Sequence, residues 1–208
     1  EAAWTAASLY QRAGQDSDAI TAYARFVDKF PSPVEQAMEA RLQLVSLYEK
    51  ADDVAKQRYW QQQIVTADRS AGPQRSDRTR YLAAHARLAL ATADLEKYQR
   101  VKLIEPLKKN LAAKKDLMKV TIAGFTEAAG YKVADVTTQA TFLTGELYAD
   151  FSKALMQSER PRSLNAEELE QYDILLEEQA YPFEEKAIEV HETNTQRIAS
   201  GVYDHWTR

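Results

Sequence analysis

The spacing of apolar residues limits this chain to helices. Over the first 31 residues, apolar side chains recur at intervals of three or four, with an interruption at Gly14 and a stop at Pro31. This interval is the period of an amphipathic α-helix. The segment therefore predicts two short helices joined by a turn at Gly14. Small residues at Ala3, Ala7 and Ala19 would let the two helices approach closely.

Composition extends this prediction to the whole chain. Only six glycines and six prolines occur among 208 residues, about half the usual share, and β-rich folds need many such turn residues. The hydrophobic fraction of 45% is too high for a disordered chain. An all-α fold is expected.

The first unit also carries a recognisable repeat pattern. Tyr10, Gly14, Ala19, Tyr23 and Pro31 stand at the spacing of a tetratricopeptide repeat (TPR), whose period is about 34 residues. The segment resembles one such repeat. The resemblance implies a right-handed α-α superhelix of stacked helical hairpins, in which each hairpin buries its apolar face on its neighbours.

A second, less regular unit follows directly. Ser32-Pro33-Val34-Glu35 is interpreted as a capping box with proline at the first helical position. A helix and a degenerate partner helix are expected up to residue 70, and residues 70–77 form the clearest loop. We therefore divide the chain into two TPR-like hairpins over 1–70 and longer TPR-like hairpins over 71–208.

Longer helices are expected after the loop. They cover about 78–99, 107–127 and 135–157, and a further helix is capped by Asn165 with Glu168 three residues later. That helix should run to about Ala180. It should kink or stop at Tyr181, because Pro182 lacks an N–H and its ring clashes with the preceding turn. It should then restart towards Gly201.

The C-terminal half carries a second resemblance. Its blocks are residues 146–148, 158–161, 176–180 and 182–188, together with Phe151, Ala154, Leu155, His191, Glu192, Asn194, Gly201, Tyr203, Asp204 and Trp206. They are similar to the C-terminal region of proteobacterial envelope TPR proteins described as putative TonB-system components or relatives of gliding-motility proteins. The resemblance implies a periplasmic or envelope-associated protein, with the cytoplasm as the alternative. Because the chain opens at Glu1 inside an expected helix, we expect a piece of a larger protein. No apolar run approaches the ~18 residues of a membrane span.

Residues suited to catalysis are few. The chain has no cysteine and three histidines, and His191-Glu192 lacks the second histidine of a zincin helix, since position 195 is Thr195. The glycines are isolated, so no phosphate-binding loop is expected. We expect no catalytic metal, no cofactor and no enzymatic activity. The alternative is an enzyme with a site between the C-terminal helices, around Tyr148, Glu178, His191 and Asp204.

Charge is segregated along the chain, whose formal net charge is −4. Residues 97–119 hold eight basic residues against two acidic ones, and residues 159–192 hold eleven acidic residues against three basic ones. The net charge disfavours a nucleic-acid binder. One interpretation of the basic stretch 97–119 is a membrane- or nucleic-acid-associated module that docks on anionic lipid headgroups or an acidic partner. The other is that stacked helices present opposite charges to each other or to water.

The TPR resemblance also implies a concave groove for a protein or peptide partner. The family's groove positions correspond to Trp4, Ser8, Gln11 and Arg12 in the first unit and to Leu42, Ser46, Glu49 and Lys50 in the second. Since Ala3 stands at the core position where the family prefers tryptophan, the Trp4 indole is expected on the concave side. The alternative is that Trp4 packs under a helix that precedes this segment. The expected function is a non-enzymatic protein–protein interaction scaffold.

Overall fold

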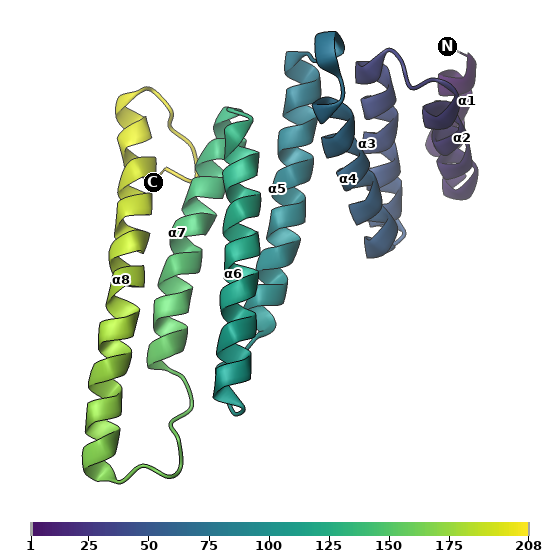
Figure 1. Ribbon diagram of the computed structural model, residues 1–208. Coiled ribbons are helices and arrows are strands. Elements are labelled where there is room, and N and C mark those ends of the chain that lie inside the picture. The colour runs from purple at the N-terminus through teal and green to yellow at the C-terminus, as the bar shows by residue number, and fades with distance from the viewer. Residues whose placement is uncertain (1, 208) are drawn as a thin grey trace. The chain divides into compact units, whose positions relative to one another are not determined.

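The computed structural model describes residues 2–207, which form eight α-helices, one short 3-10 helix and no strand (Figure 1). The helices are α1 (Ala2–Arg12), α2 (Asp16–Lys29), α3 (Val34–Lys50), α4 (Val54–Arg69), the 3-10 helix η1 (Gly72–Gln74), α5 (Asp77–Arg100), α6 (Leu107–Gly130), α7 (Ala134–Met156) and α8 (Ala166–Ala199). The expected all-α fold is confirmed. Within the described part of the chain, no helix is both long and apolar enough to traverse a bilayer.

The chain divides into two compact units, residues 1–90 and residues 91–208, so the boundary lies inside α5. The sequence placed this division at residue 70, in the loop before α5. In both units, the helices that pack side by side are neighbours in the chain. In unit 1, α2 packs on α1 and α3, and α3 packs on α4. In unit 2, α7 packs on α6 and α8. Each unit is therefore a stack of helical hairpins.

The core of unit 1 forms where α1, α2 and α3 meet. Its buried residues are Ala7, Ala19, Tyr23, Phe26, Val27, Ala40, Leu44 and Leu47. Ala7 and Ala19 have no exposed surface, so small side chains do stand at the α1–α2 contact as expected. Ala3, the other alanine expected there, is exposed.

A chain of polar side chains fixes these three helices to one another. The Tyr23 hydroxyl donates a hydrogen bond to Gln11 Oε1 over 2.9 Å, and Gln11 Nε2 donates to Gln43 Oε1 over 3.0 Å. Burial raises the pKa of Tyr23, and a hydrogen bond to Ser8 opposes this shift. The phenol therefore stays a neutral donor at neutral pH, and the register of α1, α2 and α3 is set by two directional bonds.

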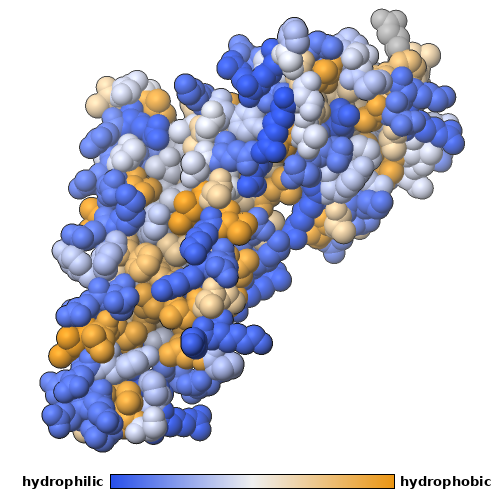
Figure 2. Space-filling model, viewed as in Figure 1, coloured by the Kyte–Doolittle hydropathy of each residue, from blue (hydrophilic) through white to orange (hydrophobic). Residues whose placement is uncertain are grey.

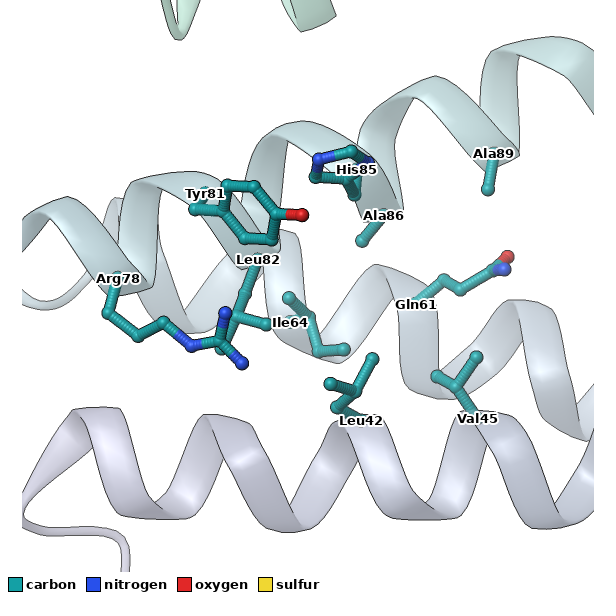
Figure 3. A pocket seen from close by; sticks show the side chains of 10 residues that line it. All are labelled: Leu42, Val45, Gln61, Ile64, Arg78, Tyr81, Leu82, His85, Ala86 and Ala89. Atoms are coloured by element: carbon teal, nitrogen blue, oxygen red, sulfur yellow. The ribbon is translucent and has the colours of Figure 1, made fainter. Parts of the chain in front are cut away.

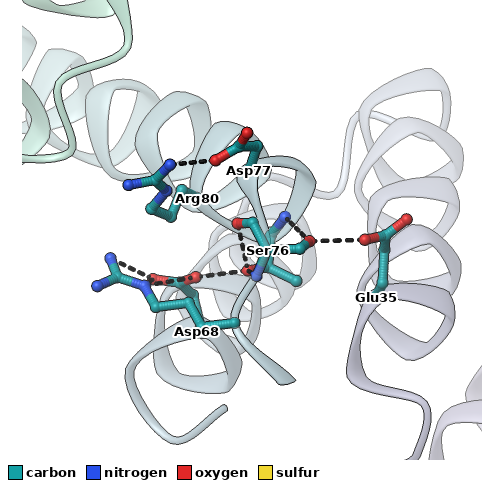
Figure 4. Close-up of polar contacts among 7 residues, drawn as sticks. Glu35, Asp68, Ser76, Asp77 and Arg80 are labelled. Atoms are coloured by element: carbon teal, nitrogen blue, oxygen red, sulfur yellow. Dashed lines mark hydrogen bonds and ion pairs between the residues drawn. The ribbon is translucent and has the colours of Figure 1, made fainter. Parts of the chain in front are cut away.

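The loop before α5 is held by a buried carboxylate at the end of α4 (Figure 4). Asp68 accepts hydrogen bonds from Arg75 Nε at 3.0 and 3.2 Å and from Thr79 Oγ1 at 2.8 Å. Ser76 and Thr79 cap the start of α5 reciprocally, each bonding the other's backbone N–H. The Ser76 hydroxyl also donates to Glu35 Oε2 on α3 over 2.6 Å. The loop therefore fixes α5 against both α4 and α3.

The expected capping box at the start of α3 is wrong. Pro33 itself is the N-cap, without a side-chain bond, and the helix begins at Val34. The cap comes from another segment, because Gln74 Oε1 accepts a hydrogen bond from the Val34 N–H over 3.1 Å. Glu35, the acidic residue of the expected box, accepts its hydrogen bond from Ser76 instead.

The core of unit 2 gathers α5, α6, α7 and α8. Its buried residues are Tyr98, Leu103, Met118, Leu147, Phe151, Leu155 and Ala180. Phe183 on α8 meets Phe151 on α7 edge-on, with ring centroids 4.6 Å apart. Phe183 and Ala180 therefore anchor the middle of α8 on α7.

A buried lysine joins α6 to the end of α5. The Lys114 ammonium donates hydrogen bonds to the carbonyls of Tyr98 and Val101 over 3.3 and 3.2 Å, and it lies 3.8 Å from the centroid of the Tyr98 ring. Asp150 on α7 lies 3.5 Å away. Burial lowers the pKa of Lys114, while the Asp150 charge raises it. The ammonium thus satisfies carbonyls at a helix C-terminus, where a positive charge is favourable.

The start of α8 is as expected. Glu168 N–H donates to Asn165 Oδ1 over 3.0 Å, and Asn165 N–H donates to Glu168 Oε2 over 2.9 Å. The predicted capping box is confirmed. It gives α8 a defined first turn at residue 166.

The predicted stop of α8 at Tyr181 is wrong. The helix continues from Ala166 to Ala199 with Pro182 inside it (Figure 1). Proline removes one backbone hydrogen bond, which leaves the carbonyl of Glu178 without its intrahelical donor. Pro182 is exposed, so water can hydrate that carbonyl. Ala180 and Ala187 are buried on either side of it, and this packing offsets the lost bond.

Replacing Pro182 with alanine should therefore stabilise the protein. Pro182→Ala restores a backbone donor in a helix that is already formed, so the free energy of unfolding should rise by about 1 to 3 kcal/mol. Urea denaturation would measure the change. Gln179→Ala is the matched control on an exposed position of the same helix, and it should stay within about 0.5 kcal/mol of wild type. An unchanged midpoint for Pro182→Ala would contradict this account of α8.

Lys114 should contribute strongly to stability, unlike its neighbour in sequence. Lys114→Ala removes the ammonium donor from the Val101 carbonyl and leaves a cavity beside Tyr98, so the free energy of unfolding should fall by about 2 to 4 kcal/mol. Lys115→Ala removes the same side chain from an exposed position and should change stability by less than about 0.5 kcal/mol. Thermal and urea unfolding of both variants test this, and equal effects would show that the buried contacts carry no stability.

Candidate functional site

Unit 1 contains a pocket between α3, α4 and α5 with a volume of about 410 Å³ (Figure 3). Its lining residues are Leu42, Val45, Gln61, Ile64, Arg78, Tyr81, Leu82, His85, Ala86 and Ala89. All ten belong to unit 1. The volume falls within the range of ligand pockets in proteins, roughly 300 to 1,000 Å³.

The pocket has an apolar wall and a polar edge. Leu42 and Val45 project from α3 and Ile64 from α4, towards side chains that descend from α5 (Figure 3). On α5, the residues at 78, 81, 82, 85, 86 and 89 follow the helical period and so share one face. Three successive helices thus contribute to one concave surface, and α5 contributes most of it.

Aromatic and cationic groups gather on the α5 side of the pocket. The ring of Tyr81 lies 4.3 Å from the ring of His85, centroid to centroid, and the Arg78 guanidinium lies 5.3 Å from the Tyr81 centroid. Glu39 on α3 holds Arg78 through bonds of 2.5 and 3.1 Å. Tyr81 is 41% exposed, so a large amphipathic ring stands where a partner would touch it. Such rings dominate binding energy at interfaces.

Among the expected groove residues, Leu42 is the one that lines this pocket. Trp4 packs on the core cluster of its own unit. Its indole is half-buried and packs edge-on against Tyr23 and Phe26 of α2, at centroid distances of 5.5 and 5.6 Å. The indole therefore covers the core cluster of unit 1, while Ala3, assigned to the core from the repeat pattern, is exposed.

The remaining residues of the first expected set have mixed roles. Gln11 is held between Tyr23 and Gln43, and Ser8 is half-buried beside Tyr23. Arg12 is exposed. Gln11 and Ser8 therefore serve the contacts between α1, α2 and α3.

The second expected set, on α3, lies at the surface apart from Leu42. Ser46 and Glu49 are exposed. Lys50 forms an ion pair with Asp16 of α2 over 2.6 Å. None of these three lines the pocket.

Sequence reasoning missed the contribution of α5. The segment 78–99 was identified as a helix, but its residues were not assigned to a groove, because the repeat spacing lengthens after residue 70. The periodic row that includes Arg78, Tyr81, Leu82 and His85 was the available signal. It marks the face of α5 that lines the pocket with α3 and α4.

The residues of the alternative enzyme site have separate contacts in the structure. Asp204 accepts hydrogen bonds from Thr138 Oγ1 and the Trp206 N–H, over 2.6 and 2.8 Å. Glu178 borders an exposed hollow beside Tyr181. Tyr148 packs at the edge of the unit 2 core. Within residues 2–207, no three His, Asp or Glu side chains are grouped as a metal site would require.

His191 has a packing role on α7. A Cβ at position 145 would lie 2.6 Å from His191 Nε2, so only glycine lets the imidazole rest there. The ring also meets Phe142 edge-on at 5.3 Å, and its Nε2 lies 3.3 Å from Glu146 Oε1. Gly145 and His191 thus form a close contact between α7 and α8.

The basic stretch 97–119 is only partly a free surface. Lys114 is buried, and Lys97 pairs with Asp94 over 2.7 Å. Arg100, Lys102, Lys108, Lys109 and Lys115 are exposed. The stretch thus combines one structural charge with a cationic surface on the end of α5 and on α6.

Comparison with known proteins gives no relative. No family model, no curated protein and no solved structure matches this chain. The TPR resemblance thus rests on the residue spacing of the first unit and on the stacking of helical hairpins. The candidate functional site is therefore the pocket in unit 1, which is defined by its volume and lining residues.

The contact between Gly145 and His191 predicts a non-additive pair of substitutions. Gly145→Ala should lower the free energy of unfolding by about 1 to 3 kcal/mol, because the new methyl group displaces the imidazole. In a His191→Ala background the space is open, so the same change should be neutral or stabilising by up to about 1 kcal/mol. A double-mutant cycle in urea measures the coupling. Additive effects would contradict the contact.

Proposed function

We propose that this chain is a non-enzymatic interaction module that binds a partner peptide in the pocket between α3, α4 and α5. The supporting observation is the pocket itself, with an apolar wall from three helices and an exposed Tyr81 beside Arg78. An apolar side chain of the peptide enters between Leu42 and Ile64. Its backbone or a carboxylate meets the polar edge.

The chemistry of the edge favours a peptide over a purely apolar ligand. Arg78 and Gln61 supply N–H donors at the pocket, and Tyr81 supplies a ring with a polar tip. Peptide carbonyls accept from such donors. The Arg78 guanidinium stays charged, since its hydrogen bond to Glu39 raises its pKa further.

Rigid helices make such a site efficient. Leu42, Ile64 and Tyr81 stand on long helices whose ends are fixed by hydrogen bonds, notably those of Asp68 and Ser76. Little conformational entropy is lost in ordering the pocket when the peptide binds. A few anchor contacts can then give useful affinity.

The wider proposal is that the chain is a TPR-type repeat protein of the bacterial envelope. Support comes from the spacing of Tyr10, Gly14, Ala19, Tyr23 and Pro31, and from hairpins that pack on their neighbours in each unit. In TPR-type modules the inner helix of each pair faces the ligand. In this proposal α3 and α5 are the inner helices, and the outer helix α4 closes the pocket between them with Gln61 and Ile64.

Leu42 provides the direct test. Panning a random peptide library against the full chain should enrich binders, and one synthetic copy of an enriched peptide is titrated by fluorescence polarisation. Leu42→Glu places a charge in the apolar wall, so the dissociation constant should rise at least tenfold, which is about 1.4 kcal/mol. Circular dichroism and urea denaturation confirm that the variant is folded.

Ser46→Glu is the matched control. It adds the same charge one turn further along α3 at an exposed position outside the pocket. The dissociation constant should change less than about twofold, since a surface charge there is screened by solvent. The proposal is contradicted if the library yields no enriched peptide, or if Leu42→Glu leaves the dissociation constant of an enriched peptide unchanged.

A further inference from the structure

The outer surface of α8 carries a row of exposed apolar residues in unit 2. Ile174, Tyr181 and Ile188 stand seven residues apart, with exposed fractions of 53, 57 and 59%. Residues seven apart lie nearly above one another on a helix. The row spans about 21 Å along α8, at 1.5 Å per residue. Figure 2 shows patches of apolar surface among polar residues on the face of the molecule that is in view.

This row is distinct from the face that packs on α7. The buried residues of α8 are Ala180, Ala187 and Asn194. At 100° per residue, Tyr181 lies about 100° from Ala180 around the helix. The row is therefore beside the packed face, and shallow hollows border it at Ile174 and Tyr181 and again at Ile188.

Glutamates flank the row along its length. Glu177, Glu178 and Glu192 border the two hollows, and Glu185 accepts a hydrogen bond from the Tyr181 hydroxyl over 2.9 Å. In the described part of the chain, none of these four carboxylates forms an ion pair. The lysine of this segment, Lys186, is paired with Glu189 over 2.6 Å. The row thus carries uncompensated negative charge.

We propose that this surface of α8 binds a cationic amphipathic helix of a partner protein. Apolar residues spaced seven apart on the partner would pack on Ile174, Tyr181 and Ile188, as in the seam of a coiled coil. Lysine or arginine residues beside them would pair with Glu177, Glu178, Glu185 and Glu192. This site is in unit 2 and goes beyond the peptide pocket of unit 1.

The charges and exposures of the chain argue against the other occupants. A second α8 would bring the same glutamates together, and like charges across an interface are unfavourable. The basic helix α6 exposes one large apolar residue, Val120, on its described surface, so it does not supply a matching row. An anionic membrane would be repelled by the glutamates. A separate cationic helix satisfies both the apolar and the charged parts of the surface.

The test uses a designed probe. It is a fluorescent peptide of about 21 residues, long enough to span the row, with leucine at every seventh position, lysine beside each leucine and alanine elsewhere. Polarisation titration with the full chain should give saturable binding. A peptide with glutamate in place of every lysine should bind at least tenfold more weakly.

Two serine variants of similar exposure locate the binding surface. Ile188→Ser removes a member of the row and should weaken binding at least tenfold. Leu175→Ser removes a side chain that is 57% exposed on another side of α8 and should change binding less than twofold. Equal losses from both variants, or no binding of the lysine peptide, would overturn the proposal.

Self-association is the remaining outcome to separate. Sedimentation equilibrium of the wild-type chain should show no dimer that Ile188→Ser abolishes. If such a dimer forms, a second copy occupies the surface and the proposal of a cationic helix is overturned. Circular dichroism of each variant confirms that the helices are intact.

Discussion

The carboxylate of Asp68 is the group on which the geometry of unit 1 depends. A carboxylate without exposed surface is strongly unfavourable unless donors surround it, and Arg75 and Thr79 supply them from the loop and from the first turn of α5. Ser76 extends the same network to α3. Because α5 provides most of the pocket lining, the position of the pocket follows from how this one charge is satisfied.

In unit 2, close contacts between helices have the role that the buried carboxylate of Asp68 has in unit 1. At Gly145 the backbone of α7 comes into contact with an imidazole from α8, and Lys114 places an ammonium against the Tyr98 ring and two carbonyls at the end of α5. The first contact requires glycine at position 145, because a Cβ there would meet the imidazole. Neither contact involves the outer surface of α8. Packing within unit 2 therefore does not explain the row of exposed apolar residues on that surface.

Local signals in the sequence predicted the helices well. The expected helix over 107–127 is α6 at Leu107–Gly130, and the one over 135–157 is α7 at Ala134–Met156, because period and caps are properties of neighbouring residues. Predictions that depended on contacts between residues distant in sequence were less successful. Gln74, forty residues away in sequence, caps α3, Trp4 covers the core in place of Ala3, and packing on both sides of Pro182 keeps α8 intact. The pocket was missed for the same reason, since it needed the placement of α5 beside Leu42.

The boundary between the two units lies within α5, and this determines where the chain can be cut to produce fragments. Units joined by an irregular linker can be cut apart at the linker, where backbone is open to proteases. Here the loop at 70–77 looks like such a place, yet a fragment ending there would keep Leu42 and Ile64 and lose Arg78, Tyr81 and His85. A fragment that preserves the pocket must instead end within a continuous helix, near residue 90. Deletion at the visible loop would therefore divide the pocket.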